Sequence, residues 1–484
     1  MVTAATRARW AWKISAALLL ATLMVLLLTA AGSGPAYPAV TAGYWSDPAT
    51  WGGAVPGEGD TVTIPSGKTV VLDTSPPRLN GLQVDGTLRF KDKNLALSSD
   101  WIVVHGRLEV GTERTPFRSK ARIVLTGDDR TQNVMNMGAK VLGVMGGTLD
   151  IHGQERRGWT RLAANAARGS GRITLQNASG WRAGDRIVVA STDYDPHQAE
   201  ERTIKNVSGD TVTLDRPLER PHRGSVQTIA GRPVDERAEV ALLSRNVVIE
   251  GEEATSADGF GAQVMVIEGG VARIEGAELT RMGQKNTLRR YPLHFHMLGE
   301  GGASSYLRKT SIHKTFNRCL TVHGTDRLAI SGNVCHDHLG HGYFFEDGAE
   351  TDNAVTGNLG LTTRRPAEGE RLLPSDGSPA TFWITNPDNV VRNNVAAGSE
   401  GKGFWLAYPE HPTGLSTDPN IWPRRTPLGE FSDNTAHSND HDGLHIDGGP
   451  RPDGTTETTV YQPRADPADG GSTIIGAEFT GFKA

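Results

Sequence analysis

A repeat in the second half of the chain constrains the fold more than any other feature of the sequence. The segments NVCHDHLGHGYFFE, NVAAGSEGKGFWLA and NTAHSNDHDGLHID begin at Asn333, Asn394 and Asn434, and each has a glycine nine residues after its asparagine. An apolar, a variable and a second apolar residue follow each glycine. Repeats of this kind, with an asparagine at a fixed corner, are typical of solenoids whose coils stack on one another.

Six pentads share the apolar, variable, apolar pattern. They are PLHFH from Pro292, CLTVH from Cys319, GYFFE from Gly342, TFWIT from Thr381, GFWLA from Gly403 and GLHID from Gly443. Because side chains alternate between the faces of a strand, the second and fourth positions should point into the solenoid and the third and fifth should point out. The predicted core column is Leu293, Phe295, Leu320, Val322, Tyr343, Phe345, Phe382, Ile384, Phe404, Leu406, Leu444 and Ile446.

The rest of the chain also has a strand pattern. Apolar residues alternate along the first half, as at Val62 and Ile64, with Gly or Asp-Gly at the bends. We therefore expect an all-β protein with an N-terminal β domain over residues 40–160, a small β-unit over 161–235 and a right-handed parallel β-helix over 236–484. Two Pro-rich insertions, RRPAEGERLLPSDGSP and PEHPTGLSTDPNIWPRRTP, are expected on loops of the β-helix.

The outward columns carry the chemical groups, because stacking places equivalent positions of neighbouring coils roughly 4.8 Å apart. The fifth-position column is His296, His323, Glu346, Thr385, Ala407 and Asp447, and the third-position column is His294, Thr321, Phe344, Trp383, Trp405 and His445. Imidazoles and carboxylates provide acid and base groups. The predicted catalytic residues are His294, His296, His323, Glu346, Asp347 and Asp337. Exposed indoles at Trp383 and Trp405, with His445 and Asp447 beyond them, are predicted to bind sugar rings.

Basic residues and further histidines lie in the same coils. Arg290, Arg308 and Arg318 are predicted to bind the carboxylates of an acidic polysaccharide, with a solvated surface as the alternative. The candidate metal ligands are His313, His336, His338 and His341. Imidazoles suit a transition metal, although this spacing matches no standard zinc pattern, and calcium prefers oxygen ligands.

Charge, cysteine content and the N-terminus limit the class of protein. A formal net charge of -5 and a pI near 6.3 argue against a general nucleic-acid binder. The two cysteines, Cys319 and Cys335, exclude a disulfide scaffold and leave one bond between them open. A basic leader and an apolar run from Ile14 to about Ala31 predict a signal peptide or an uncleaved membrane anchor over residues 1–35. The remainder should be secreted, or held at the outer face of the membrane through that segment alone.

A family resemblance rests on a set of residues in the first half. The set is Trp45, Trp51, the PGEGD turn from Pro56, Asp73, and the glycines Gly52, Gly53, Gly57, Gly59, Gly67, Gly81, Gly86 and Gly106. It resembles the eight-glycine (G8) domain of the cell-migration-inducing and cell-surface hyaluronidase family, and YPLHFH and CLTVH resemble that family's β-helix. The resemblance implies an extracellular protein that binds or depolymerises hyaluronan or a similar uronate-containing glycan, with a dependence on calcium. The chain ends at STIIGAEFTGFKA without the family's further domains, which predicts a fragment or a minimal bacterial-style relative.

Three functions remain open at this level. Hydrolysis requires two carboxyl groups about 5 to 9.5 Å apart, for which Glu346 with Asp347 or Asp337 is the candidate pair. β-Elimination requires a base and a cation, for which His296, His323 and Arg318 are the candidates. The alternative to both is a non-catalytic glycan-binding or adhesion module in which the histidines are structural.

Overall fold

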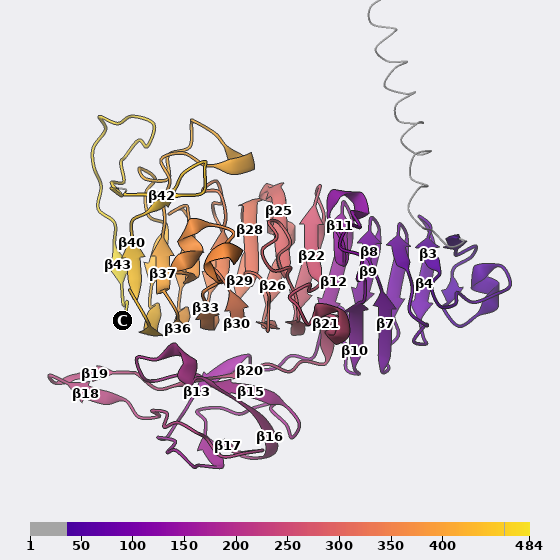
Figure 1. Cartoon of the computed structure of the whole chain (residues 1–484), viewed down its shortest axis with the longest axis horizontal. Helices are drawn as coiled ribbons and strands as arrows, with labels where there is room; N and C mark the ends of the chain where they lie inside the picture. The colour runs from indigo at the N-terminus through magenta and orange to yellow at the C-terminus, as the bar shows by residue number, and fades with distance from the viewer. Residues whose placement is uncertain (1–35, 459) are drawn as a thin grey trace, which may run out of the picture.

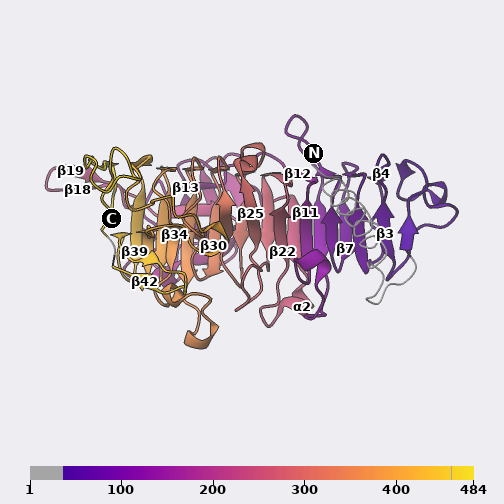
Figure 2. The ribbon, with the colours of Figure 1, turned by 90° about the horizontal axis from the view of Figure 1, so that it is seen from above.

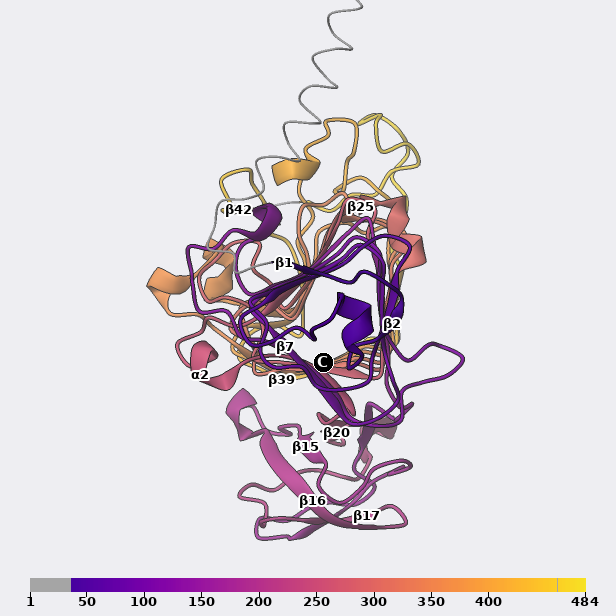
Figure 3. The same ribbon diagram turned by 90° about the vertical axis from the view of Figure 1, so that its right-hand side faces the viewer.

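The chain folds into a long parallel β-helix with a smaller β domain attached to one side (Figure 1). A computed structural model describes residues 36–458 and 460–484. Three sheets run along the solenoid, and a view along its axis shows them around a common core with the attached domain below (Figure 3). The prediction of an all-β chain with a parallel β-helix is confirmed.

Sheet A forms the face that carries the six pentads. Its twelve strands are, in spatial order, β1 (Ala36–Pro38), β3 (Thr61–Ile64), β5 (Gly81–Val84), β8 (Ile102–Val104), β11 (Val141–Met145), β22 (Gln263–Ile267), β25 (Leu293–Gly299), β28 (Leu320–Thr325), β31 (Tyr343–Phe345), β34 (Ala380–Ile384), β37 (Lys402–Leu406) and β40 (Leu444–Ile446).

Sheets B and C form the other two faces. Sheet B contains β2 (Gly43–Tyr44), β4 (Thr69–Leu72), β6 (Thr87–Phe90), β9 (Arg107–Val110), β12 (Thr148–His152), β23 (Val271–Glu275), β26 (Tyr306–Arg308), β29 (Ala329–Ser331), β32 (Ala354–Thr356), β35 (Val390–Arg392), β38 (Glu430–Ser432) and β43 (Phe479–Thr480). Sheet C contains β39 (Thr435–Asn439), β36 (Val395–Ser399), β33 (Leu359–Arg364), β30 (Val334–Leu339), β27 (Ser311–His313), β24 (Ala277–Thr280), β21 (Val247–Gly251), β10 (Ala121–Leu125) and β7 (Leu95–Ser99).

The attached domain has an antiparallel sheet of its own. Its strands are β13 (Trp159–Arg161), β20 (Glu239–Leu242), β15 (Arg186–Val189), β16 (Glu200–Ser208), β17 (Thr211–Leu214) and β14 (Arg172–Thr174), with a hairpin of β18 (Gln227–Ile229) and β19 (Arg232–Val234). A second hairpin, β41 (Gly449–Pro450) and β42 (Thr456–Glu457), lies near the last coils.

Helices are short in the described part of the chain. They are α2 (Glu253–Ser256) and the 3-10 turns η1 (Pro48–Trp51), η2 (Val134–Asn136), η3 (Pro196–Gln198), η4 (Glu300–Ser304), η5 (Glu368–Glu370), η6 (Pro374–Gly377) and η7 (Gly414–Ser416). Among the described residues, no helix has the length and apolar character that a membrane span requires. The predicted signal peptide or anchor, residues 1–35, lies outside the described residues.

The solenoid is continuous across the boundary between the two halves of the chain (Figure 2). Strand β11 pairs in parallel with β22, and β12 pairs with β23, so coils that precede the attached domain stack directly on coils that follow it. The attached domain therefore interrupts the sequence of the solenoid without interrupting its stacking. This arrangement keeps the core unbroken, because each coil covers the apolar side chains of the next.

The register of sheet A agrees with the pentad alignment. Leu293 pairs with Leu320, His296 with His323, Phe344 with Trp383, and Trp405 with His445. The predicted core column is buried from Leu293 to Leu406, in one continuous apolar cluster. The last pentad is the exception: Ile446 remains 37% exposed, because no strand pairs with β40 on its outer side within sheet A.

A ladder of asparagines fixes one corner of the coils. The Nδ2 of Asn333 donates to Oδ1 of Asn358 at 2.9 Å, and the same bond runs from Asn358 to Asn394 and from Asn394 to Asn434, at 3.0 Å each. Each Nδ2 also donates to a backbone carbonyl of a sheet B strand in the preceding coil, so the buried amides are satisfied. The sequence repeat exposed three rungs of this ladder, and Asn358 is the fourth.

The attached domain packs against sheet C through apolar and charged contacts. Apolar side chains of β15 and β20 form one cluster with those of β30, β33 and β36. Around it, His336 pairs with Glu201 at 3.1 Å and His437 pairs with Glu239 at 2.9 Å. Imidazoles of the solenoid thus bind carboxylates of the attached domain at two points.

Candidate functional site

Three histidines meet on the outer face of sheet A, where β25 and β28 lie side by side. His294 and His296 alternate with the inward Leu293 and Phe295 on β25, and His323 lies beside His296 on the next coil. The ring centroids are 4.8 to 5.8 Å apart. The strand alternation that the sequence predicts therefore brings these imidazoles together. We call His294, His296, His323 and Glu346 the histidine cluster.

His323 is the central member of the cluster. Its Nδ1 lies 3.0 Å from Nδ1 of His296, and its Nε2 lies 2.6 Å from Oδ2 of Asp347. Asp347 is itself fixed, because its Oδ2 also accepts from the backbone N–H of Ser416 at 3.2 Å. The carboxylate therefore orients the His323 ring and directs its Nδ1 toward the other histidines.

Glu346 completes the cluster from β31's C-terminal side. Its Oε1 accepts a hydrogen bond from the Tyr291 hydroxyl at 3.2 Å. Its Oε2 lies 3.5 Å from Nδ1 of His323 and 3.9 Å from Nε2 of His294, and this buried oxygen has no hydrogen-bond partner. Tyr291 was not among the predicted site residues, although it directly precedes the first pentad.

His294 is fully buried and unsatisfied. Neither of its ring nitrogens has a hydrogen-bond partner within the described chain, and its side chain is 0% exposed. The backbone of Arg289 approaches the ring without completing a hydrogen bond. A buried polar side chain without a partner is costly, so this imidazole requires an explanation beyond the protein atoms around it.

A buried carboxylate behind the cluster shapes the turn that carries Asp347. Glu350 is fully buried and accepts backbone N–H bonds from Gly324 at 2.9 Å, Asp347 at 3.1 Å and Gly348 at 2.8 Å. Burial nevertheless raises the pKa of Glu350, and Asp347 adds to this effect. Glu350 therefore stabilises the turn that carries Asp347 and does not face the histidines. The pentad pattern did not predict this role.

The pKa values within the cluster diverge. Burial, with the charges of His296 and His323, lowers the pKa of His294 well below its usual value, and burial with His323 lowers that of His296 to about 4. Burial also opposes a charge on His323, but its hydrogen bond to Asp347 and the charge of Glu346 raise its pKa to about 9. Burial raises the pKa of Glu346 to about 7 against the attraction of His323. At neutral pH His296 is therefore uncharged, and its Nδ1 can accept the proton that His323 directs at it.

An open groove begins at His296 and runs toward the N-terminal coils. It has a volume of about 650 Å³ and is lined by His296, Arg289, Arg290, Glu268 and the apolar side chains of Met135, Met137, Met145, Met265 and Ile267, with Asn136. Neither Arg289 nor Arg290 makes a side-chain ion pair or hydrogen bond to another described residue. Two adjacent unpaired guanidinium groups provide a site for anions.

The aromatic column lies on the same face but is covered. The side chains of Phe344, Trp383 and Trp405 are 1%, 1% and 6% exposed. They point outward from the strands as predicted, but the first Pro-rich insertion packs on them through Leu373. The expectation of exposed indoles is therefore wrong, because strand alternation predicts a direction and not what lies in that direction.

Arg318 and Asp376 hold that insertion in place. Arg318 is 1% exposed, forms an ion pair with the fully buried Asp376, and lies 4.5 Å from the centre of the Phe344 ring. Its guanidinium is committed to this carboxylate, so Arg318 is not available for an anionic substrate as predicted. The prediction for Arg318 failed because its partner Asp376 lies in a loop whose path the repeat does not determine.

Two other predicted residues lie on other faces. Arg308 belongs to β26 of sheet B, where it pairs with Glu113 at 3.2 Å and stacks on Tyr306. Asp337 lies on β30 of sheet C and pairs with Arg364 at 2.6 Å. Neither joins the histidine cluster, so among the predicted carboxylates Asp347 alone lies beside Glu346.

His445 and Asp447 lie at the far end of sheet A. Nδ1 of His445 pairs with Asp442 at 2.9 Å, and its ring meets the Trp405 indole edge-on. The backbone carbonyl of Asp447 accepts from Nε1 of Trp405 at 2.6 Å. Both residues therefore close the aromatic column rather than extend the groove at His296.

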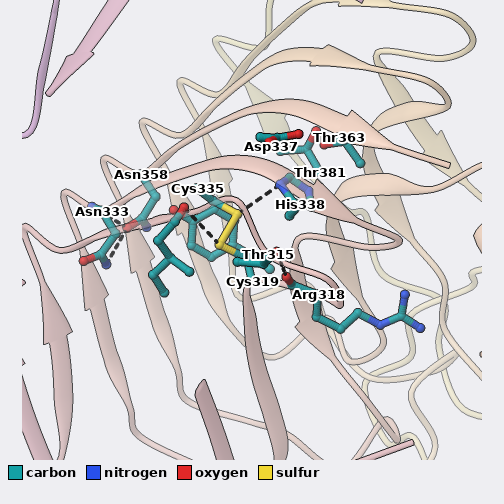
Figure 4. The surroundings of a disulfide bond; sticks show 12 residues. Thr315, Arg318, Cys319, Asn333, Cys335, Asp337, His338, Asn358, Thr363 and Thr381 are labelled. Atoms are coloured by element: carbon teal, nitrogen blue, oxygen red, sulfur yellow. Dashed lines mark hydrogen bonds between the residues drawn. A yellow bond between two sulfur atoms is a disulfide. The ribbon is translucent and has the colours of Figure 1, made fainter. Parts of the chain in front are cut away.

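The four predicted metal ligands are dispersed. His313 pairs with Glu278 and His336 with Glu201, both at 3.1 Å, on sheet C. His341 donates or accepts a bond with Ser375 at 3.0 Å under the insertion. His338 contacts the disulfide that joins Cys319 and Cys335, with its Nδ1 3.2 Å from Sγ of Cys335 (Figure 4). The structure does not bring these four together, because successive histidines of HDHLGH occupy different faces and a corner.

Calcium, which the family resemblance implies, does not fit the groups that converge here. In the described chain, one set of three or more His, Cys, Asp or Glu side chains brings its ligand atoms together, namely His294, His296 and His323, within 4.8 Å of one another. Calcium takes six to eight oxygen ligands. Three imidazole nitrogens and one carboxylate do not provide them, so the histidine cluster is not a calcium site.

The fold and the cluster define a class of protein: a parallel β-helix with ionisable groups gathered on one outer face. The G8 domain profile matches residues 50–163 and the CEMIP beta-helix profile matches residues 259–444. The chain therefore belongs to the family that combines a G8 domain with a CEMIP β-helix.

Curated relatives agree with this family. The chain is 38% identical to mouse fibrocystin-L over 83% of its own length and 10% of that protein, and 38% identical to human cell surface hyaluronidase CEMIP2 over 60% of its length and 24% of that protein. It is 32% identical to communication mutant protein F of Dictyostelium discoideum, covering 83% of this chain and 38% of that one. The chain thus spans less than half the length of each of these relatives.

Among solved structures, the tailspike of Acinetobacter baumannii bacteriophage AP22 is 12% identical, with a TM-score of 0.20 over 73% of this chain and 65% of that one. A similarity this low carries no argument about ligands.

Proposed function

We propose that the protein is a secreted or surface-held polysaccharide-binding and depolymerising protein that acts on hyaluronan or a similar uronate-containing glycan. The observation that carries the proposal is the open groove, in which two unpaired arginines lie beside His296 at the edge of the histidine cluster. The relation to the cell surface hyaluronidase CEMIP2 supports this substrate class and an extracellular location.

The groove suits an acidic chain. Each uronate carries a carboxylate, which the guanidinium groups of Arg289 and Arg290 are shaped to accept. Methionine side chains on the groove floor provide adaptable apolar contact for the sugar faces. The arginines would therefore position a uronate next to His296.

The cluster provides the groups for proton transfer. Glu346, with a pKa raised to about 7, is partly protonated at neutral pH and suits an acid role, whereas neutral His296 suits a base. For β-elimination, a base removes the proton at C5, the bond from C4 to the bridging oxygen breaks, and an acid protonates that oxygen. For hydrolysis, Asp347 is the remaining partner for Glu346, but it is 6% exposed and bound to His323. The geometry therefore favours elimination over hydrolysis.

The test is to incubate the purified protein with hyaluronan, alginate and polygalacturonate, with neutral dextran as a control. Shortening of a uronate chain with new absorbance from an unsaturated uronate would support elimination, and shortening without that absorbance would support hydrolysis. Tight binding without shortening would support the non-catalytic binding module instead. Absence of both binding and shortening on every uronate polymer would refute the proposal.

A further inference from the structure

We propose that His294, His296, His323 and Glu346 form a binding site for one divalent transition-metal ion, with zinc as the best match. The inference rests on the geometry of the cluster alone. An ion bound there would take up the free atoms of His296 and Glu346, so the acid and base roles proposed above belong to the metal-free protein. The proposed site also replaces the predicted ligand set His313, His336, His338 and His341, which does not converge.

The nitrogen positions fit a shared ion. Two ligands that each lie about 2.1 Å from a tetrahedral zinc are roughly 3.4 Å apart. The Nδ1 atoms of His296 and His323 are 3.0 Å apart, and a nitrogen of His294 lies within 4.8 Å of both. Small rotations of the rings suffice to place all three around one centre.

The carboxylate fits a fourth ligand position. Oε2 of Glu346 has no hydrogen-bond partner and lies 3.5 Å from His323 and 3.9 Å from His294. Tyr291 occupies the other oxygen of the same carboxylate, which leaves Oε2 directed at the imidazoles. A zinc site of nitrogen ligands with one carboxylate oxygen has this composition.

A second layer of contacts orients the ligands. Asp347 accepts from Nε2 of His323 at 2.6 Å, so Nδ1 is the nitrogen left for an ion. Metal-binding histidines commonly have their other nitrogen bound to a carboxylate in this way. Tyr291 plays the corresponding part for Glu346. The two contacts bind Nε2 of His323 and Oε1 of Glu346, and they leave Nδ1 and Oε2 free to bind an ion.

A proton shared between His296 and His323 explains less. It would account for the 3.0 Å separation of the two nitrogens, but it would leave both nitrogens of His294 and Oε2 of Glu346 buried without partners. One metal ion would satisfy the three histidines and the carboxylate together. The ion would also lie at the end of the groove, since His296 lines it.

The experiment uses the full protein, stripped with a chelator and then titrated with Co²⁺, Zn²⁺ or Ca²⁺. We expect uptake of about one Co²⁺ or Zn²⁺ per chain, visible absorption bands from nitrogen-coordinated Co²⁺, and a higher melting temperature with Zn²⁺ but not with Ca²⁺. His296→Ala, at a partly exposed position, should lose these bands. Asp347→Asn, which removes the charge that orients His323 and changes none of the four ligands, should lower zinc affinity about 10- to 100-fold.

His105→Ala is the matched control, because His105 is an imidazole bound to Asp85 on a distant coil, and it should bind metal as the wild type does. Equal metal uptake by wild type and His296→Ala would overturn the proposal, as would absence of Co²⁺ bands in a folded wild-type protein. Metal binding without glycan shortening would refute the proposed function and leave the metal site standing. Shortening by a metal-free protein that takes up no ion would do the reverse.

Discussion

The outer face of sheet A contains two regions that share one strand pattern but differ in what covers them. On β25 the outward column reaches an open groove at His296, whereas on β31, β34 and β37 it is covered by the insertion that carries Leu373 and Asp376. Both regions contain buried polar atoms without a hydrogen-bond partner, namely both ring nitrogens of His294 in the first and Nε1 of Trp383 in the second. The second region differs in that Leu373 of the insertion packs on its aromatic side chains. The strand register fixes which side chains point outward, and the loops decide which of them meet solvent.

The largest expected effect is on the covered region. Arg318→Ala leaves the Asp376 carboxylate buried and unpaired, and we expect the free energy of unfolding to fall by about 3–5 kcal/mol. Urea unfolding measures this. Arg289→Ala, on the open side, should change it by less than about 0.5 kcal/mol. Similar small losses for both variants would contradict the difference between the two regions.

Glycan affinity should depend on the open region. Arg290→Ala removes a guanidinium from the groove, and we expect hyaluronan affinity to fall about 10- to 100-fold, since a hydrogen bond to a charged group contributes about 1.5–3 kcal/mol. Titration at low and high salt measures it. Arg308→Ala on sheet B is the matched control and should bind hyaluronan with wild-type affinity. Equal losses of affinity in the two variants would show that the groove is not the glycan-binding site.

A smaller effect should follow from shortening the insertion side chain that packs on the aromatic column. Leu373→Ala removes a partly buried side chain from the aromatic cluster, at a cost of about 1 kcal/mol. Tryptophan fluorescence should shift to longer wavelength as the indoles of Trp383 and Trp405 meet water. If hyaluronan affinity rose in this variant, the aromatic column would be a latent sugar-binding surface; the packing described here predicts no gain.

The smallest effect is a pH dependence of the covered region. Burial opposes a charge on Asp376, but Arg318 and His341 outweigh it, so the pKa of Asp376 is lowered in the folded protein. A lowered folded pKa stabilises the fold above the ordinary carboxyl value near 4 and loses that contribution as the pH falls further. Asp376→Asn should therefore show a flatter melting temperature below about pH 4 than the wild type. A steeper fall would contradict this assignment.

The sequence predicted the part of the site that depends on periodicity. Alternation along PLHFH and CLTVH placed His294, His296 and His323 on one face, and the pairing of His296 with His323 confirms the register. Proximity of Glu346 and Asp347 followed from the same alignment. These relations are local to a strand or repeat from coil to coil, so a single sequence contains them.

Relations that pass through loops were not predictable in this way. The pairing of Arg318 with Asp376 joins residues 58 positions apart through an insertion that breaks the repeat. His313 and His336 also bind separate carboxylates instead of one shared ion. His313 pairs with Glu278, whereas His336 pairs with Glu201 of the attached domain, 135 residues earlier in the chain. Sequence spacing says nothing about such contacts, and the dispersed histidines were grouped only because they are neighbours in sequence.

The asparagine ladder has a consequence for how such a chain changes length. Every rung presents the same donor to the next coil and the same acceptor to the previous one, as from Asn358 to Asn394. A duplicated coil inserted at that point would therefore find matching bonds above and below it. Growth by whole coils leaves the corner intact, whereas gain or loss of a single residue at the corner would displace the amide of that rung from its two neighbours.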